Sequence, residues 1–134
     1  TVYNVLINNS NTFGWYNCDK FWNDPRPKTD MIVQIPSGFD QSNSSVYIAF
    51  ENEKNALMHL FTYDANNNMY GTPQPAIPDG IKGHIIFVGE QNGQYKYEII
   101  STIITNSPVF NINPGNLITA SNYQQLENHI LSLP

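Results

Sequence analysis

The pattern of apolar and polar residues along the chain predicts a series of short β-strands and a single helix at the C-terminal end. Within 30–35 and 45–50, the residues expected on one face are all apolar, which is typical of half-buried strands. The segment 2–7 is also expected to be a strand, and 109–112 a further short one.

Two longer segments, 84–90 and 94–105, are predicted to pair as a β-hairpin. Between them stands Gln91-Asn92-Gly93, and Asn-Gly is the strongest short hairpin signal because both residues tolerate positive φ angles. In the second segment, alternation predicts one face that carries Tyr95, Tyr97, Ile99, Ser101 and Ile103.

The segment 55–63 fits two patterns, a helix with one apolar stripe and a strand buried on both faces. We predict a strand, because its neighbours are strands and the polar turn 64–68 follows at once. Several prolines and a glycine then predict an irregular connection over 73–80.

The last element is predicted to be a helix. Ser121 followed by Gln124 matches a capping box, in which each side chain satisfies a free backbone N–H of the first turn. A stripe at helical spacing then provides a face to bury. It consists of Tyr123, Leu126, Ile130 and Leu133.

Composition supports an all-β protein. Isoleucine, valine and threonine, whose branched side chains suit a pleated surface, far outnumber alanine and leucine. About seven strands at spacings of roughly ten residues predict an antiparallel β-sandwich of the immunoglobulin-like or transthyretin-like kind, with a short C-terminal helix. We expect residues 1–134 to form one such domain.

Charge narrows the possible partners. The chain has a net charge of −5 and only 13% charged residues, with asparagine, 19 in all, taking their place. An acidic chain without clustered Lys and Arg is not expected to bind nucleic acid. No apolar run reaches 18 residues, so no membrane-spanning helix is expected.

Cofactor and metal sites have little support in the sequence. The single cysteine, Cys18, is expected to be a small buried apolar side chain. The histidines lack zinc-site spacing, and we expect no cofactor. Asp64, Asn66 and Asn68 match the start of a calcium loop, but the glycine at the sixth position and the glutamate at the twelfth are missing. A polar hairpin turn is the commoner structure for such a segment.

An aromatic cluster is the main candidate for ligand binding. Aromatic faces stack on sugar rings, and neighbouring amides and carboxylates hydrogen-bond the hydroxyls, so this segment could bind carbohydrate. The alternative is that the aromatic residues fill the core while the polar ones tie down a loop. The candidate residues are Trp15, Tyr16, Trp22, Asn23 and Asp24.

The segment Gly14-Trp15-Tyr16-Asn17-Cys18-Asp19-Lys20-Phe21 resembles a Gly-Trp-x-Asn-Cys-Asp-basic-Phe signature of uncharacterised exported proteins of Bacteroidetes-type bacteria. Tyr16 stands where that group would have an aliphatic residue. The resemblance implies the C-terminal domain of a larger surface protein or lipoprotein, located in the periplasm or at the cell surface. It carries no activity over to this chain.

These observations rank three functions. We expect a non-catalytic structural or protein-interaction module of an exported bacterial protein, with protein or glycan at the cell surface as its partner. A carbohydrate-binding module is the alternative. A small hydrolase ranks third and no enzyme is expected, because no nucleophile motif is present and the Ser, His and Asp residues show no ordered relation in sequence.

Overall fold

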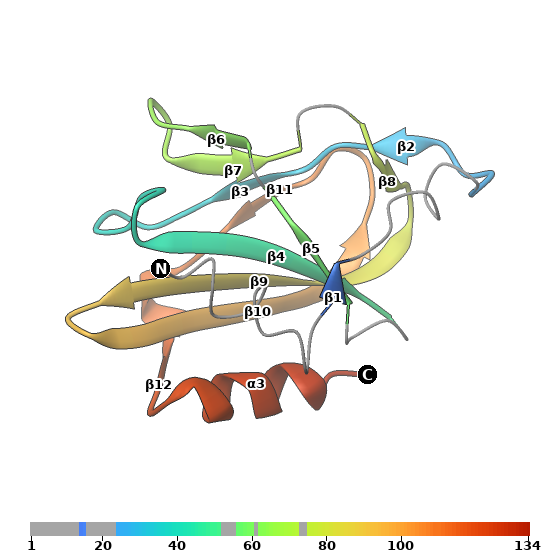
Figure 1. Ribbon diagram of the computed structural model, residues 1–134. Helices are drawn as coiled ribbons and strands as arrows, with labels where there is room; N and C mark the ends of the chain where they lie inside the picture. The colour runs from blue at the N-terminus through green and yellow to red at the C-terminus, as the bar shows by residue number, and fades with distance from the viewer. Residues whose placement is uncertain (1–13, 16–23, 52–55, 61, 73–74) are drawn as a thin grey trace.

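The computed structural model describes residues 14–15, 24–51, 56–60, 62–72 and 75–134. Two β-sheets lie face to face in it, and a helix covers the outer face of the larger sheet (Figure 1). The predicted all-β sandwich with a C-terminal helix is therefore confirmed.

The larger sheet has six strands, and its two longest strands form the β9–β10 hairpin. Most neighbours are antiparallel, whereas the pair at one edge, β1 with β5, is parallel. In spatial order the strands are β1 (Gly14–Trp15), β5 (Ala56–His59), β4 (Ser44–Phe50), β9 (Ile81–Gln91), β10 (Gln94–Ile104) and β12 (Ile118–Ala120).

The smaller sheet has four strands and also contains one parallel pair, β11 with β3. Its strands in spatial order are β11 (Val109–Asn111), β3 (Ile32–Gln34), β7 (Met69–Gly71) and β6 (Thr62–Asp64). A separate two-stranded pair is formed by β2 (Lys28–Thr29) and β8 (Ile77–Pro78).

The β9–β10 hairpin confirms the Asn-Gly prediction. Asn92 and Gly93 have φ angles of 55° and 75°, and a two-residue turn of type I′ requires positive φ at both positions. Gln91 pairs with Gln94 across the turn, and the pairing continues without interruption to Ile81 and Ile104. The turn therefore determines which residues face each other along the whole hairpin.

The larger sheet is covered on both faces, because its strands alternate between two separate cores. Ile85 and Phe87 face the smaller sheet, whereas Ile86 and Val88 face the helix. Every residue of β4 is buried for the same reason. The prediction of a half-buried strand over 45–50 was therefore wrong, because the helix covers the face that was expected to meet solvent.

The segment predicted as one strand over 55–63 is strand rather than helix, but it is divided. β5 belongs to the larger sheet and β6 to the smaller one, so the chain crosses from one sheet to the other between them. Next to the crossing, Leu60 donates its backbone N–H to the carbonyl of Val46, 3.0 Å away. Alternation along the sequence continues through such a crossing and cannot show it.

The helix α3 (Tyr123–Leu131) begins one residue later than predicted. Asn122, not Ser121, is the N-cap, and its side chain accepts from the N–H of Gln125 at 2.9 Å. The Gln125 side chain in turn accepts from the N–H of Ser121. Leu126 and Ile130 are fully buried against the sheet, as the stripe predicted.

The sequence did not predict some of the elements, and two of its predictions fall on residues that the structure does not describe. The chain returns to the larger sheet through the 3₁₀ turn η1 (Pro114–Asn116) and strand β12, neither of which alternation indicated. The expected strand over 2–7 and Cys18 lie outside the described residues.

His59 predicts a specific pH dependence of stability. It stacks on Tyr47 with ring centroids 5.0 Å apart, and burial lowers its pKa from 6.5 to about 4. Between these pH values the unfolded chain binds a proton that the folded chain does not, so stability falls as the pH decreases from 6.5 to 4. Urea unfolding midpoints at pH 7, 5.5 and 4 measure this loss.

The variant His59→Gln is the control, and its stability should change less over the same window. A further loss below pH 4 is expected in both proteins, because hydrogen bonds hold the pKa of Asp40 and Asp64 below the usual range. Parallel curves for the two proteins between pH 6.5 and 4 would show that His59 is not the titrating group.

Candidate functional site

The predicted aromatic cluster lies mostly outside the described residues, which exclude Tyr16, Trp22 and Asn23. Trp15 lies in β1, and its backbone pairs with Leu57 at the edge of the larger sheet. Carbohydrate binding by this cluster therefore stays a prediction.

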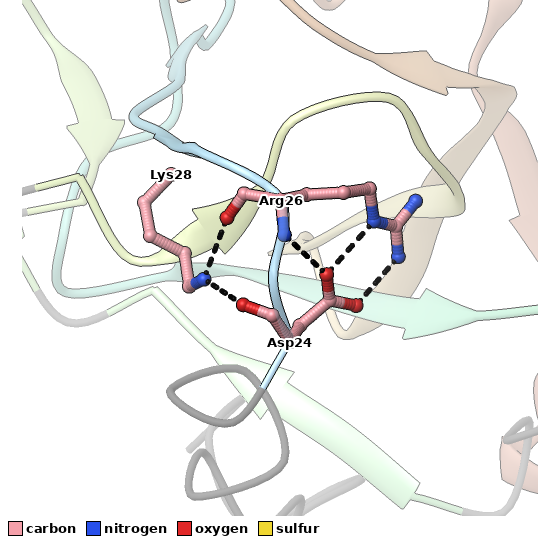
Figure 2. A network of polar contacts seen from close by, with 3 residues as sticks. All are labelled: Asp24, Arg26 and Lys28. Atoms are coloured by element: carbon pink, nitrogen blue, oxygen red, sulfur yellow. Dashed lines mark hydrogen bonds and ion pairs between the residues drawn. The ribbon is translucent and has the colours of Figure 1, made fainter.

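Asp24, the last candidate of that cluster, belongs to a compact polar network (Figure 2). Its carboxylate accepts from the backbone N–H of Arg26 at 2.9 Å and from the guanidinium at 3.0 and 2.8 Å. Lys28 donates to the backbone carbonyls of Asp24 and Arg26, each at 2.9 Å. These bonds fold residues 24–28 into a tight loop and use the carboxylate that was considered for sugar hydroxyls.

The calcium-loop candidate forms the hairpin turn between β6 and β7. The Asp64 carboxylate accepts from the N–H groups of Asn66 and Asn67 and from the Asn67 side chain at 2.7 Å. The Asn68 side-chain oxygen accepts from the Tyr63 hydroxyl, and its amide donates to the carbonyl of Phe39. The side-chain oxygens of Asp64 and Asn68, two of the three candidate calcium ligands, thus accept hydrogen bonds within the turn, and the segment is a polar hairpin turn.

A pocket that the sequence did not indicate lies beside His84 and Ser101. It has a volume of about 410 Å³. The two residues face each other across β9 and β10, on the sheet face that carries α3. The pocket is lined by Glu51, Lys82, Gly83, His84, Ser101, Thr102, Ile103 and Pro134.

Hydrogen bonds on both ring nitrogens hold the His84 ring. Nε2 lies 3.0 Å from the backbone carbonyl of Pro134, and Nδ1 lies 2.7 Å from the hydroxyl of Ser101. A carbonyl can only accept, so in the neutral ring Nε2 carries the proton and Nδ1 accepts from Ser101. Ser101 is an exposed residue that lines the pocket, whereas His84 is buried.

The pairing of His84 with Ser101 could have been derived from the predicted turn. Gln91 and Gln94 flank the two-residue loop. His84 lies seven residues before Gln91 and Ser101 lies seven residues after Gln94, so the two are opposite each other. A search for motifs along the sequence misses such a pair, since its members are brought together only by the register.

The outer edge of β10 is the second feature that the structure adds. Residues in an antiparallel pair direct their hydrogen-bonding groups alternately to one neighbour and the other. Because Gln94 bonds to Gln91 across the turn, Ile99, Ser101 and Ile103 direct their N–H and C=O groups away from β9. On that side β12 pairs only with Tyr95 to Tyr97. In the part of the chain that the structure describes, no strand pairs with the outer side of residues 99–103.

This stretch of edge lacks the features that normally prevent strand pairing. Proteins protect free edges with charges, prolines or bulges, but Ile99-Ile100-Ser101-Thr102-Ile103 contains neither charge nor proline and pairs with β9 without a bulge. Ile103 is 50% exposed. The backbone N–H of Asn113 donates to the Glu98 side chain at 3.1 Å. The open stretch of the edge, Ile99 to Ile103, begins at the next residue of β10.

Comparisons with protein-family models, curated proteins and solved structures found no match for this chain. In the part of the chain that the structure describes, no cluster of three or more His, Cys, Asp or Glu side chains is placed to bind a metal ion. Within the same residues, no helix combines the length and apolar character needed to cross a membrane.

The Asp24 network predicts that the pKa of Asp24 depends on Arg26. Hydrogen bonds from Arg26 lower the pKa of Asp24 from 3.8 to about 2. In Arg26→Gln we expect this pKa to rise toward its usual value, because the guanidinium bonds and charge are lost. NMR titration of the Asp24 carboxyl carbon measures the pKa, and Lys82→Gln, which removes a cation elsewhere, is the matched control. An unchanged pKa in Arg26→Gln would mean that the backbone N–H alone sets it.

The β6–β7 turn predicts that calcium leaves the melting temperature unchanged. A loop that bound calcium with a dissociation constant of about 1 mM would be stabilised by about 1.4 kcal/mol at about 10 mM calcium, which raises the melting temperature by several degrees. We expect the melting temperatures with calcium and with a chelator to agree, because the carboxylate of Asp64 is engaged within the turn. A calcium-dependent rise that Asp64→Asn abolishes would restore the calcium loop.

Proposed function

We propose that this chain is a non-catalytic protein-interaction module that binds an extended polypeptide segment along the outer edge of β10. The observation that supports the proposal is the open, uncharged edge from Ile99 to Ile103. In strand addition, backbone hydrogen bonds provide affinity, and pockets beside the edge select side chains.

The surroundings of this edge fit such a role. Ile99 packs against the core between the larger sheet and α3, and this contact holds the strand on the sheet. Ser101 and Ile103 are exposed. The pocket beside Ser101 and Ile103 lies on the same sheet face and offers a site for one side chain of an added strand. A strand that β9 already holds in an extended conformation needs little reorganisation to bind a further strand.

The cellular context belongs to the same proposal. The resemblance of 14–21 to a signature of exported proteins supports a role in the periplasm or at the cell surface of a Gram-negative bacterium, as part of a larger exported protein or lipoprotein. Fractionation of the producing bacterium, followed by immunodetection of the protein, tests this location. Recovery in the cytosolic fraction alone would contradict it.

The edge is tested with an array of eight-residue peptides rich in Val, Ile, Thr and Ser. We expect the protein to bind a subset of them, and Ile103→Lys to bind the same peptides at least about tenfold more weakly, because a lysine at the edge opposes pairing. Val109→Lys is the matched control, since it places the same charge at an exposed residue of β11. Equal binding by both variants, or no binding by a protein that is monomeric, would refute the proposed edge.

A second candidate function, a small hydrolase, is favoured by one observation. The Ser101 hydroxyl donates to an unprotonated imidazole nitrogen in a pocket, which is the arrangement of a serine nucleophile with its base. The ring is held by a backbone oxygen of Pro134, where a serine hydrolase triad has an Asp or Glu side chain. For this reason the non-catalytic function ranks first.

A fluorophosphonate probe distinguishes the two functions. In an active serine, the hydroxyl oxygen forms a bond to phosphorus, fluoride leaves, and the proton passes to His84. The interaction module predicts no labelling beyond that of Ser101→Ala. Labelling of Ser101 that is lost in His84→Gln would establish the hydrolase instead.

A further inference from the structure

We infer that the segment that occupies the β10 edge is the same edge of a second copy of this chain, paired antiparallel with Ser101 opposite Ser101. The inference rests on the proposed function, since it names the partner for that edge. It would join the larger sheets of two copies across a twofold axis.

The register follows from the direction of the free backbone groups. Only residues whose N–H and C=O point outward can bond across the new junction, and in the part of β10 beyond β12 these are Ile99, Ser101 and Ile103. Antiparallel pairing about Ser101 places Ile99 opposite Ile103 on both sides of the axis. Each of the three residues would then donate one hydrogen bond and accept another.

Side chains favour a second copy as the partner. Ile103, half exposed in the isolated chain, would lie beside Ile99 of the other copy on the face that carries α3. Pairs of branched apolar side chains in directly opposed positions stabilise a sheet. The pairing also brings no charged residue opposite another, although the whole chain has a net charge of −5.

Symmetry gives a further reason. Pairing about a twofold axis occupies the open stretch of both copies, so the assembly ends at a dimer. Pairing with a different edge of the next copy would leave one edge free on each copy and would continue into a filament. A five-residue junction is also short compared with stable interfaces, which bury about 1,200–2,000 Å². We therefore expect a weak, reversible dimer that depends on protein concentration.

The experiment is sedimentation velocity from about 10 µM to about 1 mM protein, a range that covers weak association. We expect the unaltered chain to shift from monomer to dimer over this range. Ser101→Lys and Ser101→Glu should each remain monomeric, because like charges meet at the axis, and an equimolar mixture of the two should regain the dimer because opposite charges meet there.

Ser101→Ala is the matched control. It removes the hydrogen bond to His84 but leaves the edge uncharged, so it should dimerise like the unaltered chain. Circular dichroism shows which charged variants fold. If one does not, Ile103→Lys against Val109→Lys provides the same comparison away from His84, with dimerisation lost only in the former.

The outcomes distinguish failure of the twofold pairing from failure of the interaction module. A chain that stays monomeric to 1 mM, or a Ser101→Lys variant that dimerises like the unaltered chain, overturns the twofold pairing. If that monomer binds array peptides through the edge, the interaction module stands with a different protein as its partner. If it binds none, both proposals fail.

Discussion

The register of the β9–β10 hairpin is the constraint on which most of the structure depends. Both strands alternate between two cores, so a slip of one residue would exchange the residues that face the smaller sheet with those that face the helix. Ile85 and Phe87 would then leave the core between the sheets, and the buried His84 would enter it. Asn92 and Gly93 prevent this slip, because a two-residue turn with positive φ angles admits a single pairing.

The same register creates the features that bear on function. It places His84 opposite Ser101 and determines which residues of β10 direct their backbone groups outward. The helix stabilises the arrangement by burying Leu126 and Ile130, each worth about 1.5–3 kcal/mol in apolar surface. The central strands of the larger sheet are therefore packed on both faces, and β10 pairs with β9 along its whole length on one side.

Close packing between the loop before β4 and the larger sheet also stabilises this arrangement. The alternation of apolar and polar residues does not reveal this contact. Phe39 lies edge-on to Phe87, with ring centroids 5.3 Å apart, and fills the space beside Gly89. A Cβ atom on Gly89 would lie 2.3 Å from the Phe39 ring, so glycine is needed at this position for packing. The contact ties the loop before β4 to the centre of the larger sheet.

Much of the fold was predictable from local patterns, and most of the candidate site was not. Alternation over 30–35 and 45–50 and the Asn-Gly turn predicted β3, β4 and the hairpin, since these signals depend on residues close together in sequence. The predicted helix cap was wrong by one residue, because Ser121 and Asn122 are both good N-cap residues. The path by which the chain enters the helix decides between them, and it makes Asn122 the N-cap. The division of 55–63 between two sheets depends on distant strands and leaves no local signal.

The sequence by itself determined the class of the protein. Branched and aromatic residues, short alternating segments and asparagine-rich turns specify an all-β chain with one amphipathic helix, because each of these signals acts through local backbone geometry. The tertiary structure alone decided that the larger sheet is covered on both faces, that Asp24 is held by Arg26, and that β12 stops after three residues. These outcomes depend on contacts between segments far apart in the chain, and among the described residues they leave the outer edge of β10 without a neighbouring strand from Ile99 to Ile103.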